Sequence, residues 1–236
     1  MVAGPRFAIY FVPAAASALY RFGAAVLGYD CYTGEPVTRP REIGLTEAAW
    51  AALTAEPRTY GFHATLKAPF RLRDEFDHHD LIAELQTLAV ATTTIPTLEA
   101  AVALIGGFVA IVPAMASPAL DKLAADCVMA FERFRAPMSA PDRSRRLAAG
   151  LSPRQTANLD RFGYPYVFEE FRFHMTLTER IGPDRRDAIH ALLSDGFAQA
   201  CRSGAIRVDR LALMRQDHPG APFRVVAHAR VRNSAG

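Results

Sequence analysis

Two short segments of the sequence share the pattern Phe-His-x-Thr-Leu, and about half the chain separates them. They are residues 62–66 and 173–177. Each falls within a stretch rich in aromatic and β-branched residues, 58–72 and 166–181, which predicts a β-strand. A predicted helix and two further strands follow each of them. This repeated order predicts two related half-units rather than a long repeat array.

The remaining segments complete the outline. We expect strands at residues 7–12, 206–215 and 223–232, a hairpin over 98–113 that turns at Gly106-Gly107, and helices at 15–27, 46–54, 80–92, 118–134 and 184–201. Residues 30–41 are rich in Gly and Pro and predict a loop. Residues 136–160, rich in Pro and Arg, predict a helical or loop insertion at the surface between the half-units.

Length and composition fit this outline. A chain of 236 residues with 50% hydrophobic and 22% charged residues is neither disordered nor collagen-like. It is long enough to bury the core of one large domain or of two small lobes. The repeat favours an α+β fold in which residues 1–236 form a single domain of two lobes, with antiparallel sheets around a central cleft.

Charge and cysteine content restrict the partners and the compartment. The formal net charge of +3 does not indicate nucleic acid as an obligatory partner. Three widely spaced cysteines without a Cys-x-x-Cys pair predict buried thiols in a cytoplasmic protein. The apolar N-terminus stops at Pro13 and predicts a strand rather than a leader, and the apolar run 100–116 is too short for a membrane span.

The repeated motifs carry the chemistry. On a strand, His63 and Thr65 share one face about 6.6 Å apart, as do His174 and Thr176, while the residues between them face the core. If the half-units pack about a pseudo-two-fold axis, two imidazoles and two hydroxyls meet in one cleft. One neutral and one protonated histidine are what acid–base cleavage of a phosphodiester requires, and both forms are accessible near neutral pH. This scheme needs no metal and no cofactor.

Other polar residues near the motifs are weaker candidates for substrate binding, and each can also be explained by solvation or packing. They are Arg58, Tyr60, Lys67, Thr178 and Arg180 along the strand faces, and Tyr164 and Tyr166 beside Pro165. The pair His78-His79 with Asp77 and Asp80 predicts a helix N-cap rather than a metal site. Arginines 143, 145, 146 and 154 predict either a solvated face or a rim that attracts phosphate.

The motifs, in their longer context, resemble those of the 2H phosphoesterase superfamily. Residues 60–70 read Tyr-Gly-Phe-His-Ala-Thr-Leu-Lys-Ala-Pro-Phe, and residues 163–178 read Gly-Tyr-Pro-Tyr-Val-Phe-Glu-Glu-Phe-Arg-Phe-His-Met-Thr-Leu-Thr. Both strings look like the DUF1045 branch, which accompanies phosphonate metabolism. The resemblance implies a metal-independent, bilobed fold in which His63 and His174 are the acid–base pair and Thr65 and Thr176 bind the phosphate. It also implies a small phosphorylated or nucleotide-like substrate, such as a cyclic phosphodiester.

Two other functions stay open from the sequence. The cleft could bind a nucleotide or a phosphorylated metabolite without turnover, although Arg or Lys would serve binding alone. A metal-dependent hydrolase is disfavoured because the histidines, cysteines and carboxylates lack the spacing of metal ligands.

Overall fold

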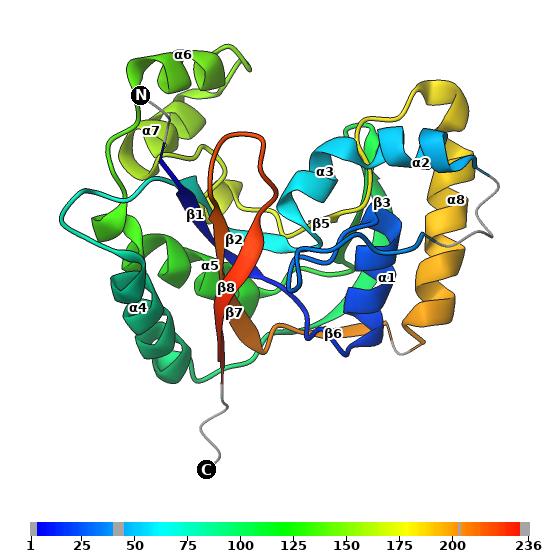
Figure 1. Ribbon diagram of the computed structural model, residues 1–236, viewed down its shortest axis with the longest axis horizontal. Helices are drawn as coiled ribbons and strands as arrows, with labels where there is room; N and C mark the ends of the chain where they lie inside the picture. The colour runs from blue at the N-terminus through cyan, green and yellow to red at the C-terminus, as the bar shows by residue number, and fades with distance from the viewer. Residues whose placement is uncertain (1–3, 40–44, 203, 232–236) are drawn as a thin grey trace.

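The computed structural model describes residues 4–39, 45–202 and 204–231, and it is an α+β fold. Within this part of the chain, eight strands form one antiparallel sheet in the order β6-β3-β4-β5-β2-β1-β7-β8 (Figure 1). The strands are β1 Arg6–Phe11, β2 Ala64–Phe70, β3 Thr97–Ile105, β4 Phe108–Pro113, β5 Met175–Thr176, β6 Ala205–Arg207, β7 Arg210–Gln216 and β8 Arg224–Arg230. The two sheets expected from the sequence are therefore joined into one.

Helices cover this sheet and fill its connections. They are α1 Ala18–Leu27, α2 Glu47–Leu53, α3 Ala55–Tyr60, α4 His78–Ala91, α5 Pro118–Ala130, α6 Ala140–Leu147, α7 Pro153–Phe162 and α8 Pro183–Ala200, with short 3₁₀ turns η2 Glu132–Phe134 and η3 Phe168–Glu170. Figure 1 shows α4 and α5 at one end of the molecule and α1 and α8 at the other. In the described residues, no helix is both long enough and apolar enough to cross a membrane.

The two half-units exchange their hairpins. The hairpin β3–β4 follows the first motif in sequence, yet β4 pairs with β5 of the second motif. The hairpin β7–β8 follows the second motif, yet β7 pairs with β1, the neighbour of β2. The helices follow the same rule, because α4 packs against β7 and β8 while α8 packs against β3. Each half of the sheet thus combines a motif strand from one half-unit with a hairpin from the other, and the two motif strands meet at the centre.

Most of the predicted elements are confirmed, and local capping explains where they begin and end. Helix α1 stops at Gly28, which adopts a left-handed conformation with φ 68°. The Thr46 hydroxyl accepts a bond from the Ala49 amide and starts α2. Asp77 forms a capping box with Asp80 at the start of α4, as expected for this cluster, and no metal-binding group of three residues is found in the part of the chain described.

Three predicted strands need correction. The stretch 58–72 starts with the end of α3, and the strand begins only at residue 64, after Gly61 at φ 72°. The strand predicted over 206–215 is divided into β6 and β7. Positions 40, 41 and 232 of the predicted loop and last strand lie outside the described residues.

The largest correction concerns residues 166–181, of which only the two residues of β5 pair as a strand. Phe168 has φ 54° within η3, which breaks the extended backbone. The Asn158 amide on α7 donates to the carbonyls of Pro165 and Val167, at 3.2 and 3.4 Å. The inserted segment 136–160 is helical, and its Asn158 side chain binds the carbonyl groups of Pro165 and Val167. In a regular sheet, these carbonyl groups would accept bonds from a neighbouring strand.

Candidate active site

The two motifs lie side by side at the centre of the sheet. Ala64 of β2 pairs with Met175 of β5 in an antiparallel register. Extending this register by one residue places His63 opposite Thr176 and Thr65 opposite His174, with Cβ atoms of opposed residues about 4.5–5.5 Å apart. The arrangement has approximate two-fold symmetry about the central pair, as expected from the repeat.

Both histidines are oriented by the same hydrogen bond. The Nδ1 atom of His63 lies 2.8 Å from the carbonyl oxygen of Gly61, and Nδ1 of His174 lies 2.8 Å from that of Arg172. A carbonyl can only accept, so Nδ1 carries the proton in both rings. Each Nε2 is then left to accept a proton, or to donate one when the ring is charged. In His63, Nε2 lies 3.2 Å from the Thr65 hydroxyl.

Burial sets the protonation of His63. Its ring stacks on the Tyr10 ring with centroids 3.8 Å apart, and the centroid of the Tyr60 ring lies 6.1 Å from that of His63. The pKa of His63 is lowered to about 4, mainly by burial; the hydrogen bond to the Gly61 carbonyl opposes this effect, and the nearby charge of His174 adds to it. His63 is therefore neutral at pH 7 and ready to accept a proton.

Two cavities adjoin the paired motifs. One, of about 250 Å³, is lined by His63 and Thr176, and the other, of about 420 Å³, is lined by Thr65 and His174. Each cavity is thus lined by the histidine of one motif and the threonine of the other, which are the pairs that the antiparallel register places opposite each other. Phe108 and Arg180 line both cavities, so the two spaces adjoin each other across the motifs.

The other sequence candidates divide into three groups. Tyr60 and Arg180 line the smaller cavity, and Tyr164, Tyr166 and Arg180 line the larger one. Thr178 also lines the smaller cavity, but its side chain is buried. Its hydroxyl accepts from the Val109 amide at 2.9 Å and donates to the Glu179 carbonyl, so its polar group serves the backbone. Arg58 lies in the last turn of α3 and lines neither cavity.

Lys67 does not share the face of His63, contrary to the expectation from residue spacing. Thr65 pairs with Tyr10, but Lys67 pairs with Ile9, so Leu66 is an extra residue that forms a β-bulge. The bulge turns Lys67 to the other face of the sheet. There its ammonium is buried, donating to the Glu132 carboxylate at 2.5 Å and to the Val128 carbonyl at 3.1 Å.

Sequence reasoning missed three residues of the site. Tyr10 supports the His63 ring and interacts with the Thr65 side chain, and burial raises its pKa well above the usual range. Phe108 lies between the cavities, with its ring centroid 6.0 Å from that of His174. Glu179 lines the smaller cavity and accepts from the Glu56 amide at 2.7 Å. Tyr10 and Phe108 occur in apolar strands, where nothing in the pattern separates them from core residues.

The cysteines lie outside this arrangement. Cys31 and Cys127 are buried as expected, whereas Cys201 is half-buried. Burial raises the pKa of the Cys31 thiol to about 11, so it is protonated at neutral pH.

The low pKa of His63 predicts a pH-dependent contribution to stability. The folded protein protonates this ring only near pH 4, whereas the unfolded chain does so near ~6.5. Between these values the unfolded state binds more protons, so stability falls as the pH is lowered through this window. We expect the wild type to lose on the order of 2 kcal/mol more than His63→Gln between pH 7 and pH 4. Urea unfolding of both proteins across this range measures the difference, and parallel curves would contradict it.

Comparison with known proteins adds two relatives. The chain is 37% identical over 221 residues to a protein of Janthinobacterium sp. (strain Marseille) named ribose 1,5-bisphosphate phosphokinase PhnN, covering 92% of this chain and 49% of that protein. It is 36% identical over 222 residues to a protein of the same name from Laribacter hongkongensis (strain HLHK9), covering 93% of this chain and 50% of the relative. The chain thus spans about half the length of these curated relatives.

A family model covers most strands of the sheet and the second motif. It matches residues 65–224, from the threonine of the first motif to the start of β8, which is more than half of the chain. The chain therefore belongs to the family described as protein of unknown function (DUF1045).

Proposed function

We propose that the protein is a metal-independent phosphoesterase of the 2H type that cleaves a cyclic or linear phosphodiester with His63 and His174. The observation that carries this proposal is the antiparallel pairing of the two motifs, with each Nδ1 held by a backbone carbonyl. Each Nε2 is thereby left to exchange protons, and the two rings approach one site from opposite ends.

The proposed reaction uses the two histidines in turn. His63 Nε2 takes a proton from water as the water oxygen bonds to phosphorus, because burial keeps this ring neutral. His174, protonated at both nitrogens, gives its Nε2 proton to the leaving oxygen as the P–O ester bond breaks. The Thr65 and Thr176 hydroxyls and the Arg180 guanidinium donate to the non-bridging oxygens as negative charge develops. The sum is the addition of one water molecule across one P–O bond.

The names of the relatives suggest the substrate class. Ribose 1,5-bisphosphate is a phosphorylated sugar, and opening a 1,2-cyclic phosphate of ribose 5-phosphate with water at the C2–O–P bond yields that compound. We propose a cyclic phosphodiester of a phosphorylated ribose as the substrate, which would place the protein in phosphonate metabolism.

A kinase function has less support in this chain. The relatives are named phosphokinases, but about half of their length lies outside the match. The 236-residue sequence contains no Gly-x-x-x-x-Gly-Lys-Ser/Thr loop, the motif that holds the phosphates of ATP in many kinases. A binding module without turnover is also less favoured, since binding alone would not need two histidines with matched Nδ1 bonds.

A substrate screen tests the proposal. We expect hydrolysis of at least one of the nucleoside 2',3'-cyclic phosphates or of 5-phosphoribosyl 1,2-cyclic phosphate, followed by ³¹P NMR as the cyclic ester opens. Because the scheme uses no metal, turnover should survive EDTA. Saturable binding of these compounds with no product over long incubation would favour the binding module, and loss of turnover in EDTA would favour a metal enzyme.

A further inference from the structure

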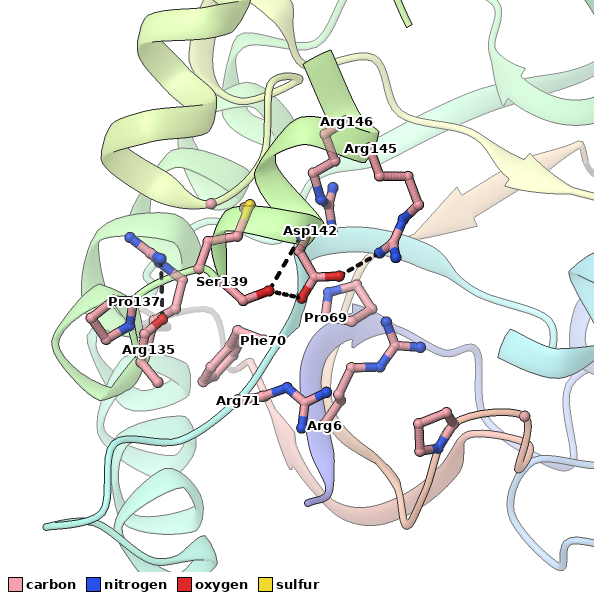
Figure 2. Close-up of a pocket in the computed structure, with 15 residues that line it drawn as sticks. Arg6, Pro69, Phe70, Arg71, Arg135, Pro137, Ser139, Asp142, Arg145 and Arg146 are labelled. Atoms are coloured by element: carbon pink, nitrogen blue, oxygen red, sulfur yellow. Dashed lines mark hydrogen bonds and ion pairs between the residues drawn. The ribbon is translucent and has the colours of Figure 1, made fainter. Parts of the chain in front are cut away.

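A separate, strongly basic pocket of about 490 Å³ lies beside the candidate active site. Five arginines and one aspartate are among the residues that line it: Arg6, Arg71, Arg135, Arg145, Arg146 and Asp142. Figure 2 shows Arg145 and Arg146 extending from α6, with Arg6 and Arg71 facing them from the strand ends. Arginines from three distant parts of the chain, at positions 6, 71 and 135–146, thus bring like charges to one cavity.

Two of these arginines are neutralised by carboxylates. Arg145 donates to Asp142 at 2.7 Å, and Asp142 also accepts from the Ser139 hydroxyl. Arg135 donates to Glu132 at 2.6 and 2.9 Å. Among the described residues, Asp142 is the only one with a carboxylate that lines the pocket, and it is already engaged with a guanidinium.

The other three arginines form no ion pair within the described residues. Arg6 donates to the Gln216 side chain at 2.7 Å, and Arg71 donates to the Gly4 carbonyl at 3.3 Å. Arg146 is half-buried over the Tyr164 ring, 5.8 Å from its centroid. Burial lowers the pKa of Arg146, and the charges of Arg145 and Arg6 act in the same direction, while Tyr164 and Asp142 oppose them. An anion in the pocket would relieve this repulsion.

Aromatic residues connect the pocket to the paired histidines. Tyr164, which lies under Arg146, lines the cavity that contains His174. On the other side, Arg6 lies 5.6 Å from the Phe223 ring, and Phe223 is 6.2 Å from Tyr10, the ring that stacks on His63. The basic pocket and the two motif cavities therefore lie around one group of aromatic side chains.

We propose that this pocket binds a second phosphoryl group of the substrate, a phosphomonoester remote from the phosphodiester that is cleaved. This inference rests on the proposed function for the identity of the ligand, but the pocket itself is defined by the unpaired arginines. Guanidinium groups suit a phosphate dianion because they donate in pairs to its oxygens. A ligand with one carboxylate carries a single negative charge, so three arginines without ion pairs fit a phosphate dianion better.

A titration tests the pocket independently of catalysis. We expect ribose 5-phosphate to bind the wild type at low ionic strength, and Arg146→Gln or Arg71→Gln to weaken binding about tenfold or more. The matched control is Arg143→Gln, because Arg143 is on the same helix but pairs with Asp160 outside the pocket. The His63→Ala/His174→Ala double variant should still bind. Unchanged affinity in both pocket variants, with melting temperatures near that of the wild type, would overturn the proposal.

A kinetic comparison tests whether the bound phosphate belongs to the substrate. We expect the wild type to prefer 5-phosphoribosyl 1,2-cyclic phosphate over ribose 1,2-cyclic phosphate by at least tenfold in kcat/KM, mainly through KM. In Arg146→Gln this ratio should fall toward one, while Arg143→Gln should retain it. An unchanged ratio in Arg146→Gln would overturn the assignment to substrate and leave a separate phosphorylated ligand as the occupant. If the wild type hydrolyses neither compound, the proposed ribose substrate is wrong; if it hydrolyses none of the cyclic phosphates in the screen, the proposed function fails. In both cases the titration still decides whether the pocket binds phosphate.

Discussion

Replacing either His63 or His174 with alanine is expected to lower turnover by about two to four orders of magnitude. Each change removes one proton transfer, from water in the first case and to the leaving oxygen in the second. Because the two transfers belong to one transition state, the double variant should lose little more than the worse single variant. The kcat of each purified variant on the substrate found in the screen measures this effect.

The control for this prediction is another histidine of the same chain. His228 is exposed on β8 and lines neither motif cavity, so His228→Ala should keep kcat within about twofold of the wild type. Circular dichroism shows whether each variant is folded, which matters most for His63 because it stacks on Tyr10. Turnover that stays unchanged in folded His63→Ala and His174→Ala would remove the mechanism.

The sequence predicted the local elements well because their signals are local. Thr46, Asp77 and Gly28 mark helix ends through their own side chains or backbone freedom, and the structure places them there. The turn at Gly106-Gly107 joins β3 to β4 as expected. These features depend on a few neighbouring residues, so the sequence alone contains the information.

The arrangement of these elements in space was harder to predict. Neighbouring elements in sequence usually pack together, which favoured two self-contained half-units. Instead the hairpins are exchanged, so that β4 and β7 lie beside the motif strand of the opposite half or its neighbour β1. A repeat in the sequence shows that two units are related. It does not show whether each unit keeps its own hairpin or exchanges it, because both arrangements bury the same faces of the same strands.

The candidate site shows the same division. The convergence of the four motif side chains follows from the repeat, and the register of Ala64 with Met175 agrees with it. The position of Lys67 does not follow, because an i, i+2 or i, i+4 count assumes an uninterrupted strand. One extra residue at Leu66 places Lys67 on the face opposite Thr65, and a second register shift follows before Phe70.

The burial of Lys67 predicts that removing its ion-pair partner, Glu132, strongly lowers the stability of the protein. Burial lowers the pKa of the Lys67 ammonium, and the Glu132 carboxylate acts in the opposite direction to keep it charged. Glu132 also accepts from Arg135, so it compensates two cations. Glu132→Ala leaves the buried Lys67 ammonium without its counter-ion and should lower the free energy of unfolding by about 3–5 kcal/mol, measured by urea denaturation.

Two further variants separate this structural role from a role in the site. Asp126→Ala removes an exposed ion pair with Lys122 on α5 and should cost less than about 1 kcal/mol. Lys67→Met removes the buried cation, while Glu132 keeps its bond to Arg135, so it should cost less stability than Glu132→Ala. Because Lys67 faces away from His63, the kcat and KM of Lys67→Met should stay close to those of the wild type. A large rise in KM for Lys67→Met, with the fold intact, would show instead that this lysine reaches the substrate and that the bulge does not hold in solution.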